Sequence, residues 1–477
     1  MRILHATSEL FPYSKTGGLA DMVAGLTGAL AEQGYEITIA TPLYRGIREQ
    51  FPELQAPSTA FQIPLGKNIF TGRWWNLNAA NGVTVKFLEN DGFFERPGLY
   101  LKGGDGYWDN PERFMFLSKA VTDLAGDFDV VHVHDWQTAF VPMLLKLGLS
   151  DNPPPTVLTI HNLAYQGSCE GHRFEISNLD ENFFDREGPE FWGSLNFLKA
   201  GLHYADAITT VSPRYAREIL SPEFGEGMEG VLRSRGEALT GILNGVDYDV
   251  WRTVDNPHLP ADYSANDLDG KNICKEALVN GLGLMDIQLP VFGVVSRLAE
   301  QKGIGLLLDA IENFLTQQKL QLVVLGDGDP QLKNRLIQLQ VKFPGTVAAI
   351  IKYDNRLAHQ IEAGSDFFLM PSRFEPCGLN QMYSLRFGTI PVVHAVGGLD
   401  DTIRDLKVST EAANGIKFSP LDKSVFQNAI SDAIDIFEDT EKRTELMTTG
   451  MNDDFSWQKS SREYSNLYQN LTDKQKT

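Results

Sequence analysis

The sequence has 477 residues, of which 42% are hydrophobic, and it carries a formal net charge of −20. This length is too great for one ordinary core and predicts two or three domains, while the apolar content excludes a disordered chain. The negative charge argues against nucleic acid or an anionic membrane as the main partner, and an anionic small substrate would need locally placed cations.

The cysteines and the apolar runs indicate the compartment. Cys169, Cys274 and Cys377 are far apart and odd in number, which predicts neither a disulfide framework nor a zinc site. The sequence enters its first predicted strand at once, without a signal or transit segment, and no apolar run is long enough to span a bilayer. We therefore expect a cytoplasmic protein.

The first predicted unit is a strand, a glycine turn, a helix and a second strand. Apolar runs at residues 3–6 and 37–40 predict two buried parallel strands, and the apolar spacing between them predicts a helix ending near Gln33. The helix begins at Gly17-Gly18, where the backbone can come close to a ligand and the helix N-terminus favours an anion. Lys15 adds a cation there, although a tight turn with a surface lysine explains the same residues.

The next stretch is predicted to be rich in β-structure and aromatic residues. Residues 74–87 predict a hairpin around Asn81-Gly82. The loop from Phe93 to Trp108 is rich in glycine and aromatic residues. Its aromatic rings are suited either to stacking on a sugar or to covering the core, and the sequence leaves both alternatives open.

The stretches 129–135 and 156–162 each predict a strand that ends in polar residues, and the stretch 207–213 is a candidate third case. In open parallel sheets, ligands bind outside the carboxyl ends of the strands. Asp135, His161 and Asn162 are therefore expected in one site, with a structural role for the histidine as the alternative.

A second α/β pattern follows. The first domain is expected to end near residues 242–247, and the polar, proline-containing stretch 256–269 is a candidate connector. Apolar runs at 290–296, 320–325, 347–351, 367–370 and 390–393 alternate with helical patterns, which predicts a second doubly wound parallel sheet. The last residues, from Trp457, predict an amphipathic docking helix whose polar tail frays from Thr472.

Cations and glycines gather at the strand ends of the second domain. Arg297 and Lys302 follow its first strand, where fixed cations can stabilise a departing diphosphate without a metal, unless they make ordinary surface contacts. Gly326-Asp327-Gly328-Asp329 is similar to a metal-binding Asp-x-Asp, but a turn approached closely by a nucleotide is the simpler interpretation.

The stretch from Ser372 to Leu379 leaves another strand and begins another helix. Glu375 is suited to accept hydrogen bonds from sugar hydroxyls, and the amides of Cys377 and Gly378 are suited to donate to phosphate. Packing is the simpler role for the Cys377 side chain, because no Cys/His motif accompanies it.

Together these motifs make the chain similar, nearly from end to end, to the glycogen/starch synthase family of retaining glycosyltransferases. The motifs that carry the resemblance are Lys15-Thr-Gly-Gly-Leu-Ala-Asp21, His134-Asp-Trp136, His161-Asn-Leu-Ala-Tyr-Gln-Gly167, Leu243-Asn-Gly-Val-Asp247, Ser296-Arg-Leu298 with Gln301-Lys-Gly303, and Ser372-Arg-Phe-Glu-Pro-Cys-Gly378.

The resemblance implies an α/β GT-B fold, in which two Rossmann-like doubly wound domains face a cleft. It implies an acceptor and catalytic domain at residues 1–245, a nucleotide-sugar domain at 246–455 and a returning helix at 456–477. The implied reaction transfers glucose from ADP-glucose to the non-reducing 4-OH of an α-1,4-glucan (glycogen) with retention, without a metal or other cofactor. Neither nucleic acid nor a membrane is an implied partner, and the oligomeric state is left open.

The resemblance also implies roles for individual residues. Catalytic roles fall to Asp135, His161, Arg297, Lys302 and Glu375, with Arg297 and Lys302 on the diphosphate and Glu375 on the glucose hydroxyls. Tyr353 lies where a nucleobase-stacking tyrosine is expected. The remaining implied substrate-binding residues are Lys15, Gly17, Gly18, Asp21, Asn162, Asn244, Gly326, Asp327, Cys377, Gly378, Leu379 and Gly398.

Three positions depart from the family pattern: Gln137 where His is common, Asn380 where Thr is common, and Tyr383 in place of a second Glu. Donor choice is therefore less firmly implied than the reaction class, and UDP-glucose is an alternative donor. Two other functions remain as alternatives: a glucan phosphorylase using pyridoxal phosphate, which needs a Schiff-base lysine, and a non-catalytic glucan-binding protein on the same fold.

Overall fold

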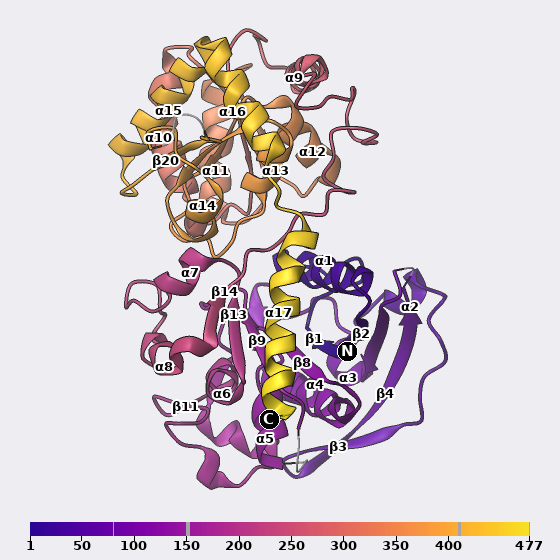
Figure 1. Ribbon diagram of the computed structural model, residues 1–477. Helices are drawn as coiled ribbons and strands as arrows, with labels where there is room; N and C mark the ends of the chain where they lie inside the picture. Colours follow the sequence, from indigo (N-terminus) through magenta and orange to yellow (C-terminus); the bar gives the residue numbers. More distant parts are fainter. Residues whose placement is uncertain (80, 149–152, 409–411, 477) are drawn as a thin grey trace. The chain divides into compact units, whose positions relative to one another are not determined.

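The computed structural model describes residues 1–79, 81–148, 153–408 and 412–476. The chain divides into two compact units: unit 1 is Met1–Gly245 with Trp457–Thr477, and unit 2 is Val246–Ser456 (Figure 1). Among the helices of the described residues, none has both the length and the hydropathy needed to cross a membrane.

Unit 1 is built on a nine-stranded sheet with the order β14-β13-β9-β8-β1-β2-β5-β4-β3. Its strands are β1 (Arg2–Ala6), β2 (Glu36–Pro42), β3 (Phe61–Leu65), β4 (Asn68–Asn78), β5 (Thr84–Glu89), β8 (Val130–His134), β9 (Thr156–Ile160), β13 (Ala207–Thr210) and β14 (Leu239–Gly241). The central strands are parallel and buried on both faces, which is why they read as continuous apolar runs. The antiparallel pairing of β4 with β5 confirms the hairpin predicted around Asn81-Gly82.

Helices and short strands complete unit 1. Its helices are α1 (Gly18–Glu32), α2 (Ile47–Gln50), α3 (Asp91–Phe94), α4 (Asn110–Leu124), α5 (Val141–Gly148), α6 (Phe197–Tyr204), α7 (Pro213–Glu218), α8 (Glu229–Arg235) and α17 (Trp457–Lys476). Its short strands are β6 (Leu101–Lys102), β7 (Asp105–Gly106), β10 (Ser168–Glu170), β11 (Glu190–Phe191) and β12 (Ser194–Asn196).

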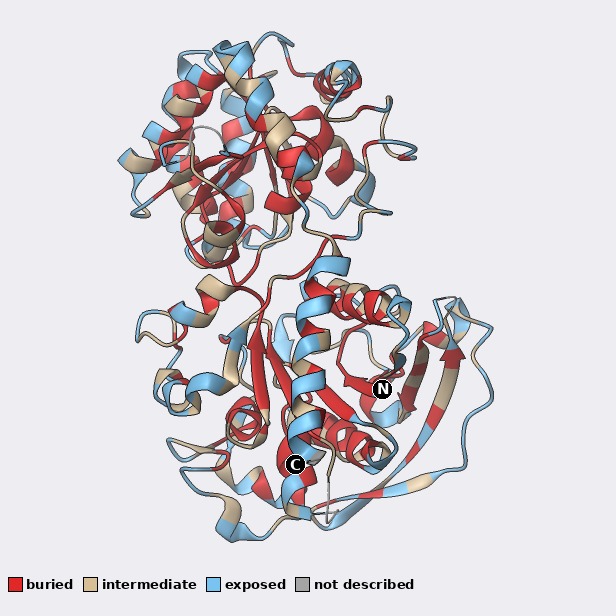
Figure 2. Cartoon of the chain, in the orientation of Figure 1, coloured by how far each residue is buried: buried red, intermediate tan, exposed pale blue. Residues whose placement is uncertain are grey.

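The C-terminal helix α17 packs against α1 although the two are far apart in the sequence (Figure 1). The indole of Trp457 covers Gly25 so closely that a Cβ there would lie 2.0 Å from its Nε1. Tyr464 and Tyr468 are fully buried, while the outer side of the helix is exposed (Figure 2). The docking prediction is therefore confirmed. The prediction of a frayed tail from Thr472 is wrong, because α17 continues to Lys476; Thr477 lies outside the described residues.

Unit 2 is built on a six-stranded parallel sheet with the order β17-β16-β15-β18-β19-β20. Its strands are β15 (Val291–Val295), β16 (Gln321–Leu325), β17 (Val347–Ile350), β18 (Phe367–Met370), β19 (Ile390–His394) and β20 (Ile416–Phe418). Its helices are α9 (Asp269–Gly281), α10 (Ile304–Thr316), α11 (Pro330–Lys342), α12 (Asn355–Gly364), α13 (Asn380–Arg386), α14 (Gly397–Thr402), α15 (Lys423–Glu438) and α16 (Thr440–Asn452). Apolar side chains pack on both faces of the sheet, as a doubly wound sheet requires.

The stretch 256–269 does not connect the two units, so that expectation is wrong. It lies inside unit 2, where the buried Tyr263 donates a hydrogen bond to the carbonyl of Phe387 at 3.0 Å. The sequence misleads here because polar and proline-containing composition also describes a loop that is folded onto a domain surface.

Each sheet has a point where the strand order reverses. In unit 1 the chain leaves β1 for β2 on one side, while β8 pairs with β1 on the other. In unit 2 the strand β15 is likewise flanked by β16 and β18. Ligands of open α/β sheets bind beyond the carboxyl ends of the strands at such points. The segments that follow β1, β8, β15 and β18 are therefore the places to look for function.

Candidate functional site

In unit 1 the glycine turn is anchored by a residue that we did not single out from the sequence. Glu9, directly after β1, is buried and accepts hydrogen bonds from the backbone N–H and the hydroxyl of Thr16, both at 2.5 Å, and from the N–H of Gly17 at 3.2 Å. Tyr100 donates to the same carboxylate at 2.8 Å. Glu9 therefore ties the glycine turn to the aromatic loop 93–108. The sequence signal for Glu9 is its position, because it is a carboxylate that lies between the end of β1 and the Gly17-Gly18 pair.

The N-terminus of α1 remains suited to an anion beyond Gly17. In the described part of the chain no side chain caps this helix, and a Cβ added to Gly17 would meet nothing within 4 Å, so the space beside the backbone is open. Lys15 lies at this turn and pairs with Asp21, its Nζ being 2.7 Å from a carboxylate oxygen. Asp21 therefore orients the lysine, and the direct substrate contact that the resemblance implies for Asp21 stays a prediction.

Asp135 and His161 meet at the ends of β8 and β9. Asp135 has a left-handed backbone with φ of 54°, and its Oδ1 accepts the backbone N–H of His161 at 2.7 Å. Burial raises the pKa of Asp135 to about 7, and the backbone N–H groups of His161 and Asn162 only partly offset this. Burial also lowers the pKa of His161 to about 3, so its imidazole is neutral at pH 7. The predicted cluster of Asp135, His161 and Asn162 thus exists.

Two further features of unit 1 suit a polar ligand. Asn244 is buried, and its Oδ1 has no hydrogen-bond partner among the described residues, which leaves an acceptor to be satisfied by a bound hydroxyl. The side chain of Asn162 instead stabilises the turn that follows it, because its Oδ1 accepts a hydrogen bond from the backbone N–H of Ala164 at 3.1 Å.

A cavity of about 780 Å³ lies in unit 1 and has aromatic walls, one of which is Trp136, the residue after Asp135. The residues lining it include Tyr107, Trp108, Trp136, Tyr165 and Arg173. The side chain of Trp108 is 77% exposed, so a large apolar face is available to a ligand. Phe93 and Phe94, in α3, are buried in the core, whereas Trp108 lines the cavity, so stacking on a sugar stays a prediction for Trp108.

In unit 2 the strand ends bring a cation and a carboxylate together. Lys302 donates to Oε2 of Glu375 at 2.5 Å, and the hydroxyl of Ser372 donates to the same oxygen at 3.0 Å. Glu375 is only 6% exposed, so the bonds compensate a buried charge. Arg297 is exposed, and its guanidinium donates to Gln301 at 3.1 Å. Two cations thus lie at the strand ends where β15 and β18 are paired.

The Asp327-Gly-Asp329 turn is accounted for by local structure. Asp327 accepts Lys333 Nζ at 2.8 Å, which lowers its pKa, and Asp329 caps α11 through the N–H groups of Gln331 and Leu332. Gly326 is required by close packing, since a Cβ there would lie 1.9 Å from the carbonyl oxygen of Ser296. These contacts support the turn interpretation made from the sequence.

The remaining candidates of unit 2 fall into two groups. Tyr353 is 81% exposed and so presents a free ring face. Cys377 is instead buried, and a Cβ on Gly398 would lie 2.0 Å from its carbonyl oxygen. A Cβ on Gly378 would lie 2.4 Å from Oε1 of Gln381, while Leu379 is partly buried. The glycine at 398 therefore has a packing reason that is independent of any ligand.

Two of the three departures from the family pattern have structural partners within unit 2. Tyr383 stacks on Trp251 with ring centroids 3.7 Å apart, and His359 stacks on the other face of the indole at 4.1 Å. The amide of Asn380 donates to the carbonyl of Val295 at the end of β15. Gln137, two residues after Asp135 in the sequence, is buried. Tyr383 thus has a packing role within unit 2.

Comparison with known proteins gives full-length matches. The chain is 43% identical over 481 residues to a glycogen synthase of Myxococcus xanthus, covering 99% of both, and 41% identical over 476 residues to one of Koribacter versatilis, covering 98% of both. The starch synthase catalytic domain model matches residues 2–234, and the glycosyl transferases group 1 model matches residues 286–450.

Solved structures give the same result. The catalytic domain of starch synthase IV from Arabidopsis thaliana, bound to ADP and acarbose, has a TM-score of 0.89 and 33% identity and covers 99% of both chains. A sucrose-phosphate synthase from Thermosynechococcus elongatus has a TM-score of 0.62 and 17% identity over 98% of both chains, which is a likeness of fold alone.

Proposed function

The chain belongs to the glycogen/starch synthase family of glycosyltransferases, and we propose that it transfers glucose from ADP-glucose to the non-reducing 4-OH of an α-1,4-glucan with retention of configuration. The family predicted from the motifs is confirmed, and so is the GT-B fold of two Rossmann-like domains. The observation that carries the proposal is the group of Arg297, Lys302 and Glu375 at the strand reversal of unit 2.

On the donor side, this group suits a sugar nucleotide. Breaking the bond between glucose and diphosphate leaves negative charge on the terminal phosphate, and fixed cations stabilise that charge. An ammonium has three N–H donors, and the bond to Glu375 occupies one donor of Lys302. Ser372 and Lys302 both bond to Oε2 of Glu375, which orients the carboxylate to accept sugar hydroxyls. The exposed ring of Tyr353 offers a stacking face for a nucleobase.

The acceptor side is assigned to unit 1. The wide cavity with Trp108 and Trp136 in its wall suits the apolar faces of successive glucose rings. Asn244 offers a buried acceptor, and His161 offers a neutral imidazole, for hydroxyl groups of the sugar. At the α1 N-terminus, Lys15 and the open space beside Gly17 suit the donor's anionic part.

The bond change balances without a protein nucleophile. The bond from C1 of glucose to the diphosphate oxygen breaks, and a bond from C1 to O4 of the acceptor forms on the same face. The acceptor proton passes to the departing phosphate oxygen, so ADP leaves as the second product. This scheme requires charge stabilisation and positioning from the chain and needs no cofactor or metal.

A reducing compartment such as the cytoplasm suits the protein, since its three cysteines are not joined in disulfides.

The test is release of ADP by the purified protein from ADP-glucose, with and without glycogen. We expect ADP release that depends on glycogen, with an equal amount of glucose added to the polymer. A competition with UDP-glucose in the same assay decides the donor. No release from either donor by folded protein would favour a glucan-binding role.

The other rival is separated by its spectrum. A phosphorylase would carry pyridoxal phosphate as a Schiff base on a lysine and would show the visible absorbance of that group. We expect no such band, and we expect no release of glucose 1-phosphate from glycogen and inorganic phosphate.

A further inference from the structure

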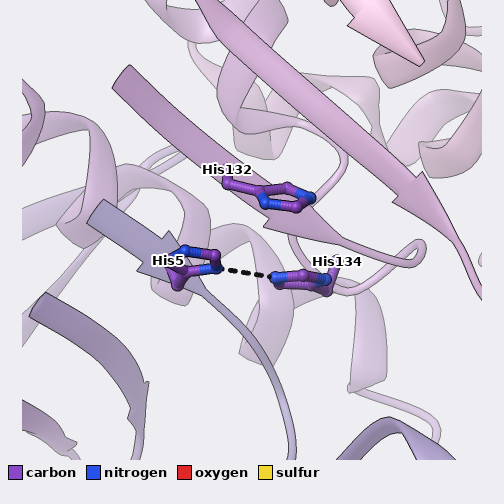
Figure 3. A group of neighbouring side chains, drawn as sticks. All are labelled: His5, His132 and His134. Atoms are coloured by element: carbon purple, nitrogen blue, oxygen red, sulfur yellow. Dashed lines mark hydrogen bonds between the residues drawn. The ribbon is translucent and has the colours of Figure 1, made fainter. Parts of the chain in front are cut away.

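Three histidines lie side by side in the core of unit 1: His5 on β1, and His132 and His134 on β8 (Figure 3). All three are fully buried. The rings of His132 and His134 have centroids 4.2 Å apart. None of these residues belongs to the motifs that suggested a function, apart from His134 as the neighbour of Asp135. Buried polar side chains of this kind require an explanation.

Two of these histidines form a hydrogen-bonded chain that ends in the candidate site. Nδ1 of His5 lies 3.1 Å from Nε2 of His134, and Nδ1 of His134 lies 3.1 Å from Nε2 of His161 (Figure 3 shows the first contact). His161 is the one member of this three-residue chain that is only partly buried. The chain therefore runs from the sealed core to the open edge of the sheet.

Every ring in the chain is neutral at pH 7. Burial lowers the pKa of His5 and of His161 to about 3, and it lowers the pKa of His134 well below its ordinary value. A neutral imidazole carries one N–H and one bare nitrogen. Each N···N contact consequently has one donor and one acceptor, and all the protons of the chain must point in the same direction.

The sealed end decides that direction. Nε2 of His5 is buried and has no hydrogen-bond partner among the described residues. A buried N–H without an acceptor is rarer in proteins than an acceptor left without a donor. His5 therefore carries its proton on Nδ1 and donates to His134, which donates from its own Nδ1 to His161. At the other end of the chain, Nδ1 of His161 can be protonated or bare, because solvent or a ligand can accept from it or donate to it.

We propose that His5 and His134 are positioning residues that fix the tautomer of His161, so that its Nδ1 carries a proton and serves as a hydrogen-bond donor to the substrate. A donor at this place suits a hydroxyl or ring oxygen of a sugar. The use of that donor rests on the proposed glucosyl transfer, whereas the tautomer itself does not.

A metal ion in the histidine cluster is the competing interpretation, since ring nitrogens of His5, His132 and His134 lie within 4.8 Å of one another. Both nitrogens of His132 are already hydrogen-bonded, Nδ1 to the hydroxyl of Tyr468 at 2.7 Å and Nε2 to the hydroxyl of Thr159 at 2.6 Å. His132 is thus held by α17 and β9 and is not available as a ligand. The hydrogen-bonded chain accounts for the other two rings without an ion.

The experiment is ¹⁵N nuclear magnetic resonance of the full chain labelled at its nine histidines, without ligand. The His161→Gln variant assigns the two ring resonances of His161. We expect a protonated nitrogen at Nδ1 and a bare nitrogen at Nε2. The reverse pattern, or two averaged resonances, would overturn the proposal, and so would a stoichiometric metal ion found in the same sample. None of these readings depends on the activity of the protein.

Substitutions at two buried histidines distinguish an effect of the hydrogen-bonded histidine chain from a general effect on core packing. His5→Leu removes the first donor, so we expect the His161 resonances to move toward the other tautomer and kcat to fall about 3- to 10-fold with little change in glucan KM, as for one neutral hydrogen bond. His132→Leu removes a ring from the same layer but outside the chain, and it should leave the His161 resonances in place. Equal shifts in both variants would overturn the proposal. If His5→Leu does not fold, the spectrum of the unaltered protein still decides.

Discussion

Replacing Lys302 with alanine tests the donor site most sharply. The change removes the ammonium that bonds to Glu375 at 2.5 Å and that we place on the diphosphate of the donor. Loss of one electrostatic contact to developing charge typically raises the barrier by about 2.7–4 kcal/mol, or roughly 10²- to 10³-fold in rate. We expect kcat to fall by that factor while the KM for glycogen changes little, since the acceptor is assigned to unit 1.

The same substitution also leaves the Glu375 carboxylate without its cation. Breaking a fully buried ion pair costs about 3–5 kcal/mol. The Lys302 side chain is 20% exposed and that of Glu375 is 7% exposed, so solvent reduces this penalty, and we expect unit 2 to lose about 1–2 kcal/mol of unfolding free energy. Because folded domains typically have about 5–15 kcal/mol of unfolding free energy, we expect the variant to remain folded at 25 °C, so that its lower turnover reports on catalysis.

The assay is steady-state ADP release, with glycogen and ADP-glucose varied separately and folding checked by thermal unfolding. Lys342→Ala is the matched control, because Lys342 forms an ion pair with Glu312 on the exposed face of unit 2. It should leave kcat unchanged. Equal losses in kcat and in glycogen affinity for Lys302→Ala, or a loss in the control as large as in Lys302→Ala, would refute the reasoning.

Three further outcomes are expected. Glu9→Ala frees the N–H groups of Thr16 and Gly17, so the KM for ADP-glucose should rise about tenfold; an unchanged KM would show that the turn holds itself. Trp108→Ala removes an exposed stacking face, so the KM for glucan should rise about tenfold with donor KM unchanged; an equal rise in both would argue against a glucan groove. Burial raises the pKa of Asp135 to about 7, so the contribution of this one carboxyl group to stability falls as pH rises from about 4 to about 7. Urea denaturation at pH 5 and at pH 8 gives the difference in unfolding free energy between Asp135→Asn and wild type. We expect this difference to shift in favour of the variant at pH 8, and an equal difference at both pH values would contradict the raised pKa.

Much of the fold can be predicted because buried parallel strands are continuous apolar runs. Strands such as Val130–His134 and Phe367–Met370 coincide with such runs and end where the runs end. The polar residues that follow them could therefore be predicted. The Gly-Gly helix start, the hairpin at Asn81-Gly82 and the docking helix from Trp457 were predicted for the same local reasons. Sheet order was not predicted, since pairing between distant strands leaves no local periodicity.

The parts that escaped prediction depend on contacts between distant segments. Glu9 holds a turn and a loop that converge only in the folded chain, and nothing in its neighbourhood indicates that Tyr100 will reach it. Tyr383 is a departure from a motif in the sequence but one layer of a stack with Trp251 in the structure. The contact between His5 and His134, whose ring nitrogens lie 3.1 Å apart, joins two strands that are distant in the sequence, so neither residue's neighbourhood indicates it.

The central claim is that Arg297 and Lys302 hold the diphosphate of the donor. The most direct measurement is a crystal structure of the protein with ADP bound. We predict that the terminal phosphate contacts the guanidinium of Arg297 and the ammonium of Lys302, with the base against Tyr353. A diphosphate bound at another surface, away from both cations, would contradict the account.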